Sequence, residues 1–166
     1  MTPDLLVGSL VLTRYRAGLV TDAHVAWLND PKVTRYSEQR HQKHTLESQH
    51  RYLNDFNAHS HVWLIRDDGE DIGTITAYRD RPNKLADMGI MIGHRRGQGN
   101  GFVTWMTVMS FLYGDGVRRI EGGCMASNAA MRRIFVKSGM VLNSVRPGHF
   151  LLDGKPEDAF YYGTPL

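Results

Sequence analysis

The chain has 166 residues, a net charge of +3, 42% apolar residues and 22% charged residues. This length fits one domain, here taken as residues 1–166, and the composition is typical of a globular protein that forms its core without metals or disulfides. The single cysteine, Cys124, excludes an internal disulfide and a four-thiolate zinc site, and it favours a reducing, cytoplasmic compartment.

Three classes of partner are not supported by the residue pattern. The N-terminal apolar run is interrupted by Gly8 and Ser9 and is too short for a membrane helix, so we expect no membrane partner. Basic residues stand in scattered pairs without interleaved aromatic residues, so we expect no nucleic-acid partner. The spaced histidines 41, 44, 59 and 61 lack cysteine or acidic partners in a zinc arrangement, so we expect no metal.

The first third of the chain predicts one strand and two helices. Residues 5–16 alternate enough to form a single strand. Thr21 or Asp22 can cap a short helix over residues 23–30, which Pro31 then ends. The polar stretch 32–44 predicts a loop. Residues 45–57 place apolar side chains near helical spacing and predict a second helix.

The rest of the chain changes from strands with short turns to alternating helices and strands. Strands are predicted over 61–67, 71–80 and 85–93, then a helix over 102–116, a strand over 118–126, a helix over 127–139, a strand over 140–146 and a hairpin from 149 to 166. This order predicts an α/β (α+β) domain with a mixed, mostly antiparallel sheet of about seven strands and about four helices.

The most informative segment is the glycine-rich turn Arg96-Gly97-Gln98-Gly99-Asn100-Gly101, which follows a predicted strand and opens a predicted helix. A helix N-terminus presents unpaired N–H groups and a partial positive charge, and glycines let the backbone approach an anion closely. Arg96 adds a cation. The turn can therefore hold a phosphate or a pyrophosphate.

Two other phosphate motifs compete for this turn. A Walker A loop is excluded because no Gly-Lys pair followed by Ser or Thr is present. A dinucleotide fingerprint stays open as an alternative, since Glu121 lies twenty residues past Gly101. However, Glu121 stands near the start of its predicted strand, and the preceding elements do not form a βαβ unit.

Two motifs at a matching separation resemble the GCN5-related N-acetyltransferase (GNAT) family. Arg96-x-x-Gly99-x-Gly101 is similar to its coenzyme A pyrophosphate loop, and residues 126–140 (ASNAAMRRIFVKSGM) resemble its second signature. The resemblance covers residues 10–162 and includes the element order. The ending, residues 145–163, is similar to the branch of the ribosomal-protein alanine acetyltransferases. Residues 27–40 resemble relatives in that branch that acetylate amino sugars.

The resemblance implies a direct acetyl transfer from acetyl-coenzyme A to a primary amine. The acceptor would be an amino sugar, a protein N-terminus or a small-molecule amine, and the enzyme a monomer or homodimer. A dinucleotide-binding enzyme and a catalytically weak coenzyme A sensor are the alternatives.

In this family the thioester lies where two parallel strands splay apart, which here corresponds to residues 86–92 and 120–126. Backbone groups of the first strand would pair with the pantetheine arm, and one N–H would polarise the thioester carbonyl. Asn128 would contact the pantetheine or serve only as a helix cap. The residues expected at the coenzyme are Ile90, Met91, Ile92, Arg96, Gly97, Gln98, Gly99, Asn100, Gly101, Phe102, Asn128 and Phe135.

The chemistry requires a neutral amine and a departing thiolate. Asp87 and Glu121 are the candidate bases, acting directly or through a water, with surface carboxylates as the plain alternative. Many family members carry a tyrosine acid seven residues after the helix-opening asparagine, but Phe135 stands there and cannot donate. Either Ser127 serves or the thiolate leaves unassisted.

The acceptor side is expected at two segments, residues 32–43 and 146–157. In this family such segments border the cleft opposite the coenzyme. Within the first segment we expect Arg35 or Tyr36 to touch the acceptor.

Overall fold

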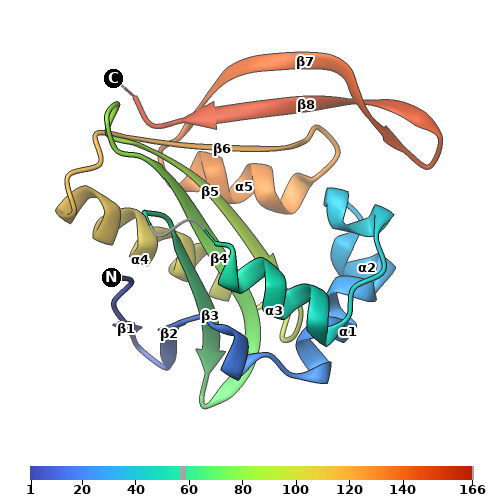
Figure 1. Cartoon of the computed structure of the whole chain (residues 1–166). Helices are drawn as coiled ribbons and strands as arrows, with labels where there is room; N and C mark the ends of the chain where they lie inside the picture. The colour runs from blue at the N-terminus through green and yellow to red at the C-terminus, as the bar shows by residue number, and fades with distance from the viewer. Residues whose placement is uncertain (57–58, 166) are drawn as a thin grey trace.

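The computed structural model describes residues 1–56 and 59–165. Its strands form one eight-stranded sheet in the order β1-β2-β3-β4-β5-β6-β8-β7 (Figure 1). The strands are β1 (Leu5–Val7), β2 (Leu10–Arg14), β3 (His61–Asp67), β4 (Glu70–Asp80), β5 (Leu85–Ile92), β6 (Arg119–Met125), β7 (Val141–Leu152) and β8 (Lys155–Gly163). Within the described chain, neighbouring strands are antiparallel except β5 and β6, which run parallel.

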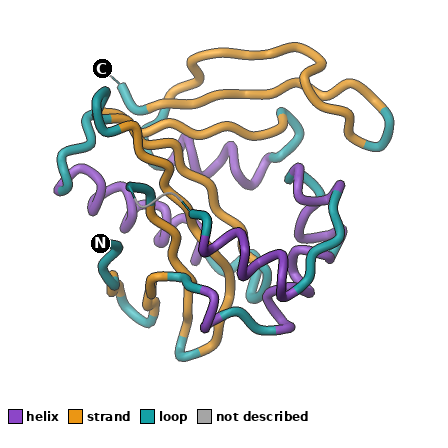
Figure 2. The backbone as a smooth tube through the Cα atoms, viewed as in Figure 1, coloured by secondary structure: helices purple, strands orange, loops and turns teal. Residues whose placement is uncertain are grey.

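Helices cover both faces of the sheet (Figure 2). They are α1 (Asp22–Asn29), α2 (Pro31–Thr34), α3 (Leu46–Asn54), α4 (Asn100–Gly114) and α5 (Ala129–Lys137), with 3₁₀ turns η1 (Ala17–Leu19) and η2 (Glu38–His41). Helices α4 and α5 contribute to the main core on one face, and α3 packs over a smaller apolar cluster on the other. None of the helices in the described residues is long and apolar enough to cross a membrane.

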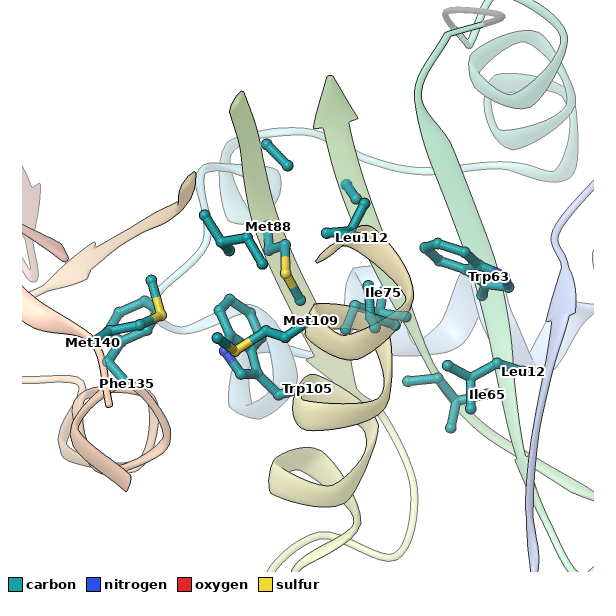
Figure 3. Packing of buried hydrophobic residues seen from close by; sticks show 14 of the residues in the cluster. Leu12, Trp63, Ile65, Ile75, Met88, Trp105, Met109, Leu112, Phe135 and Met140 are labelled. Carbon is teal, nitrogen blue, oxygen red and sulfur yellow. The ribbon is translucent and has the colours of Figure 1, made fainter. Parts of the chain in front are cut away.

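The main core lies between α4 and the middle strands. Figure 3 shows Trp105, Met109 and Leu112 of α4 packed against Ile75 of β4 and Met88 of β5. Because side chains alternate across a strand, the neighbours of these strand residues point to the opposite face, where the helices α1 to α3 lie. One face of the sheet therefore carries the main core, and the other carries the smaller apolar cluster with room for a site beside it.

The first third of the chain differs from the sequence prediction in two places. The single strand expected over residues 5–16 is wrong, because Gly8 adopts a left-handed φ of 56° and turns the chain into the β1–β2 hairpin. The loop expected over residues 32–44 is also wrong, because it contains α2 and η2. Pro31 ends α1 but occupies the first turn of α2, where its missing N–H costs nothing, and Asp30 caps that helix.

Two later elements also shift. The helix expected over residues 45–57 is capped by Thr45 and ends at Asn54, while residue 57 lies outside the described residues. The strand expected over 140–146 and the hairpin strand beginning at 149 form one strand, β7. Its pairing with β8 shifts register between Arg146 and Phe150, where Pro147 has no N–H to donate.

The predicted splay between two parallel strands is present at β5 and β6. Their pairing covers Leu85 with Arg119, Ala86 with Ile120 and Asp87 with Glu121, and does not continue beyond the last pair. From there β6 pairs with β8 and β5 pairs with β4. The predicted mixed, mostly antiparallel α/β fold is confirmed, with eight strands and five α-helices in the described chain.

Candidate active site

A cavity of about 650 Å³ opens beside the splayed strands, and we call it the α4–α5 cleft. Its walls come from the end of β5, the glycine-rich turn, the first turn of α4, one side of α5, and α2 with the residues that follow it. Most of the residues expected at the coenzyme line it, whereas Gln98 and Phe135 do not. Those that line it are Ile90, Met91, Ile92, Arg96, Gly97, Gly99, Asn100, Gly101, Phe102 and Asn128.

The N-terminus of α4 opens into this cleft without a side-chain cap. Its N-cap residue, Gly99, has a left-handed φ of 84° and supplies no capping oxygen. The other α-helices of the described chain are each capped by their own N-cap side chain. The N–H groups of Asn100 and Gly101 accordingly have no acceptor among the described residues and remain available to an anion.

The formally charged side chains that line the α4–α5 cleft in the described chain are all positive. Four cationic side chains line it and, among the described residues, no acidic one does. They are Arg95, Arg96, Arg133 and Lys137. The Arg96 guanidinium also donates through Nη1 to the Lys32 carbonyl at 2.8 Å, which ties the turn to α2. Free backbone donors, left-handed glycines and this charge fit a diphosphate group.

Asp67, at the end of β3, anchors the glycine-rich turn to the sheet. Its carboxylate accepts from Ser9 Oγ at 2.6 Å, Arg95 Nη1 at 3.0 Å and Asn100 Nδ2 at 3.2 Å. The Ser9 and Arg95 bonds hold the pKa of Asp67 below its usual range. Sequence reasoning missed this residue, because its partners lie 28 to 58 positions away along the chain.

Phe135 belongs to the core instead of the cavity wall. It is 1% exposed, stacks on Tyr162 with ring centroids 4.7 Å apart, and meets Trp105 edge-on at 5.5 Å. A Cβ at Gly122 would lie 2.9 Å from its ring, so the glycine allows this packing where β6 leaves β5. The ring therefore lies beside the splay without reaching solvent.

The two residues that precede α5, Ser127 and Asn128, lie at the cleft. Asn128 caps α5, because its Oδ1 accepts from the Met131 N–H at 3.1 Å, and it also lines the cleft. Both roles considered for Asn128 are thus geometrically compatible. Ser127 lines the cleft as well, and its backbone N–H donates to a Glu157 carboxylate oxygen at 2.7 Å.

Asp87 and Glu121 lie side by side at the last parallel pair before the splay. Neighbouring protein atoms desolvate the Asp87 carboxyl, although the residue is exposed by surface area, and together with the Glu121 charge this raises its pKa to about 6. Glu121 accepts a bond from Arg119 Nε at 2.8 Å. Alternation along β5 places Asp87 on the same face as Gly89 and Met91, away from α4.

A second cavity of about 500 Å³, the α1–α3 pocket, lies on that same face. Its walls come from α1, η2 and α3, and its floor from β4 and β5. Ser37, Ile90 and Met91 line both cavities. The two cavities therefore meet at β5.

The segments expected to shape the acceptor site do come together. Arg35 Nη2 donates to Asp153 Oδ2 at the tip of the β7–β8 hairpin at 2.8 Å, and Arg40 Nη2 donates to the Leu151 carbonyl at 2.8 Å. Figure 1 shows this hairpin reaching out from the sheet toward α2. Arg35 lines neither cavity, and Tyr36 lines the α4–α5 cleft.

Comparison with known proteins identifies a family model that matches the chain. Residues 9–141 match the model of the acetyltransferase (GNAT) domain family. No curated protein sequence matches the chain. In fold it is similar to RimL, a ribosomal L7/L12 alpha-N-protein acetyltransferase solved with coenzyme A, at 17% identity and a TM-score of 0.86, over 99% of this chain and 98% of that one.

Two further solved structures share the fold. One is the microcin C7 self-immunity acetyltransferase MccE with acetyl-CoA and AMP, at 15% identity and TM-score 0.82, covering 96% of this chain and 94% of that one. The other is a Salmonella typhimurium acetyltransferase that modifies the N-terminal serine of L7/L12, at 18% identity and TM-score 0.81, covering 96% of each chain. At these identities the likeness concerns the fold, and the expected similarity to amino-sugar acetyltransferases stays a prediction.

Proposed function

Because the chain belongs to the GNAT acetyltransferase family, as its two motifs predicted, we propose that it acetylates the primary amine of a small-molecule or peptide acceptor held in the α1–α3 pocket. Acetyl-coenzyme A is the co-substrate, and the enzyme is an acyltransferase. The observation that carries the proposal is the meeting of the two cavities at Ile90 and Met91. A thioester and an amine can approach each other only where their sites join.

The α4–α5 cleft would hold the coenzyme through groups that this chain already presents. The N–H groups of Asn100 and Gly101 and the Arg96 guanidinium would bind the diphosphate, and the unpaired edge of β5 would bind the pantetheine arm. When bound, acetyl-coenzyme A supplies the thioester carbon that the amine attacks. A backbone N–H of residues 90–92 would polarise its carbonyl, an effect worth about 3–4 kcal/mol where it has been measured.

Asp87 is the better of the two candidate bases. Its raised pKa, about 6, lets it take a proton near neutral pH, and it lies on the same sheet face as the α1–α3 pocket. Glu121 is already bonded to Arg119. Since neither carboxylate lines a cavity, a bridging water would carry the proton to Asp87. Phe135 has no proton to give, so either Ser127 supplies one or the thiolate leaves unassisted.

The proposal is tested by free-thiol release from acetyl-coenzyme A with a panel of amines, namely an amino sugar, an N-terminal serine peptide and a small aliphatic amine. We expect release with at least one of them. Arg96→Ala should weaken acetyl-coenzyme A binding by about tenfold, the loss of one charge-assisted bond. Arg118→Ala, which removes an exposed cation outside both cavities, is the matched control.

Two outcomes would contradict the proposal. Binding of coenzyme A without thiol release from any amine would favour a sensor. Binding of a dinucleotide in its place would favour the alternative enzyme class, although the antiparallel β4–β5 pair before the turn does not form a βαβ unit.

A further inference from the structure

We propose that the α1–α3 pocket selects acceptors that, apart from the reacting amine, are uncharged and carry hydroxyl or N–H donors. It rejects acceptors that carry a carboxylate or phosphate on this remaining part of the molecule. The inference rests on the proposed function and names the acceptor chemistry of the same site. It depends on three properties of the pocket wall: its lack of formal charge, its aromatic surfaces and the direction of its buried hydrogen bonds.

The wall is uncharged. Within the described chain, none of the residues lining the α1–α3 pocket is Asp, Glu, Lys or Arg. Trp27, Tyr52 and Tyr78 supply aromatic surface, and the polar members are hydroxyls, amides and imidazoles. Burial raises the pKa of Tyr15 and of Tyr52 well above the usual range of phenols, so both stay neutral. A charged acceptor body would lose its hydration here without gaining a counter-ion.

A buried network fixes the hydrogen-bonding role of Tyr15. His24, which is 2% exposed, bonds through Nε2 to Asp71 Oδ2 at 2.8 Å. Because that carboxylate only accepts, Nε2 donates to it and carries a proton. The Thr21 N–H, which can only donate, points at Nδ1 at 3.3 Å, so Nδ1 is an acceptor. The Tyr15 hydroxyl at 2.9 Å from Nδ1 must therefore donate its proton to His24.

The same logic applies to Gln49 on the other side of the pocket. His44 Nε2 lies 3.1 Å from the Gln39 carbonyl, which only accepts, so this nitrogen carries the proton. His44 Nδ1 is then an acceptor for the Gln49 amide nitrogen at 3.5 Å. The Gln49 carbonyl oxygen has no donor among the described residues.

The side-chain oxygens of two residues that line the pocket, Tyr15 and Gln49, are thus left as hydrogen-bond acceptors. A hydroxyl or N–H on the acceptor can donate to them. A carboxylate or phosphate oxygen would meet lone pairs at these two positions, and no cationic side chain among the described lining residues would compensate its charge. An amino sugar and an N-terminal serine share the favoured chemistry, an amine next to a hydroxyl-bearing carbon skeleton.

The test measures calorimetric binding to the coenzyme A-loaded protein, which needs no turnover. Glucosamine is compared with glucosamine 6-phosphate, and a Ser-Ala amide with an Asp-Ala amide. In the better-bound pair, the uncharged member should bind on the order of tenfold more tightly or better. If glucosamine binds more tightly than the Ser-Ala amide, the natural acceptor is a sugar; if the Ser-Ala amide binds more tightly, it is a peptide. Equal or tighter binding of the charged members, or no binding by either uncharged one, overturns the proposal.

A second binding experiment introduces a negative charge into the wall of the α1–α3 pocket. Gln49→Glu should strengthen binding of 1,3-diamino-2-propanol, because the wall gains its one carboxylate, and should weaken glucosamine 6-phosphate further. His50→Glu adds the same charge at the neighbouring, exposed position of α3 and should change neither. Gln39→Glu, at the exposed rim, replaces Gln49→Glu if that variant does not fold. Equal effects of the pocket variant and His50→Glu overturn the proposal.

A failure of the proposed function has a different signature. In that case these binding preferences would be found while no thiol is released from acetyl-coenzyme A with any bound acceptor. Conversely, efficient acetylation of the charged acceptors would contradict the selectivity and leave the acetyltransferase activity intact.

Discussion

The two cavities that meet at β5 are built on opposite principles. The α4–α5 cleft presents backbone donors and four cations, whereas the α1–α3 pocket presents aromatic rings and oriented acceptor oxygens without a formal charge in the described chain. The first suits an anion of fixed structure and needs little besides a turn and a helix end. The second is assembled from side chains on six elements, namely α1, η2, α3, β3, β4 and β5. The difference teaches that one strand can serve two ligands when each of its sides faces a separate chemistry.

The largest effect is expected from a variant that disrupts the backbone cradle of the α4–α5 cleft, the free N–H groups of Asn100 and Gly101. Gly99→Val forces the left-handed N-cap of α4, with φ of 84°, toward another conformation and turns its N–H groups away. Loss of about two charge-assisted bonds should weaken acetyl-coenzyme A binding by roughly 100-fold in calorimetry. Gly116→Val, at a similar φ of 82° beyond the other end of α4, should cost similar stability and leave that affinity unchanged. Equal affinity losses would contradict the cradle.

A smaller loss is expected at the base. Asp87→Asn should lower kcat/KM by about tenfold or more, and Glu121→Gln by less, because Arg119 already holds Glu121. The wild-type rate should rise with pH through about 6, the pKa of Asp87, and this rise should vanish in Asp87→Asn. If neither variant loses tenfold, or about 1.4 kcal/mol, no side-chain base acts.

The raised pKa of Asp87 also leads to a prediction about the free energy of unfolding. The folded-state pKa of Asp87 lies above its ordinary value of 3.8, so the folded protein disfavours the charged form. Its contribution to the free energy of unfolding therefore falls as pH rises from about 4 to about 6. Asp87→Asn should remove this fall, so the variant should gain stability relative to wild type between those pH values. Urea unfolding at pH 4 and pH 7 measures it, and an unchanged difference would contradict the raised pKa.

The wall of the α1–α3 pocket offers a test of packing. The Trp27 ring lies directly over Gly93, so a Cβ there overlaps the ring and must displace it. Gly93→Ala should lower the free energy of unfolding by about 1–3 kcal/mol and raise the acceptor KM, since Trp27 lines that pocket. In a Trp27→Leu background the added cost in urea unfolding should shrink. Additive costs would show that the two residues do not interact.

The smallest effect is expected from breaking the ion pair between Arg35 and Asp153. Both side chains are well exposed, at 47% and 67%, so solvent screens the ion pair and its contribution is small. Arg35→Ala should raise the acceptor KM by a factor of about five or less and leave acetyl-coenzyme A affinity unchanged. Tyr36→Ala should instead weaken acetyl-coenzyme A binding, because Tyr36 lines the α4–α5 cleft. Steady-state kinetics with each substrate varied in turn would separate the two.

What the sequence could reveal depended on how local each feature is. The glycine-rich turn and Asn128 act within a few residues of themselves, so spacing was enough to place both at one cleft. The roles of Asp67 and His24 come from partners 28 and 47 positions away, which no short motif encodes. Phe135 was assigned to the coenzyme by analogy, but its ring packs into the core because Gly122 leaves room for it. Turn glycines misled the prediction at Gly8, where one expected strand becomes a hairpin.

Residues Ile90 and Met91 form a short stretch of β5 that lines both cavities, so both occupants contact it. If one occupant tightens that stretch and so raises affinity for the other, thermodynamic reciprocity requires the second to raise affinity for the first by the same factor. Synergy between the two substrates, measured from either direction, would therefore report on the stiffness of a single short stretch of backbone.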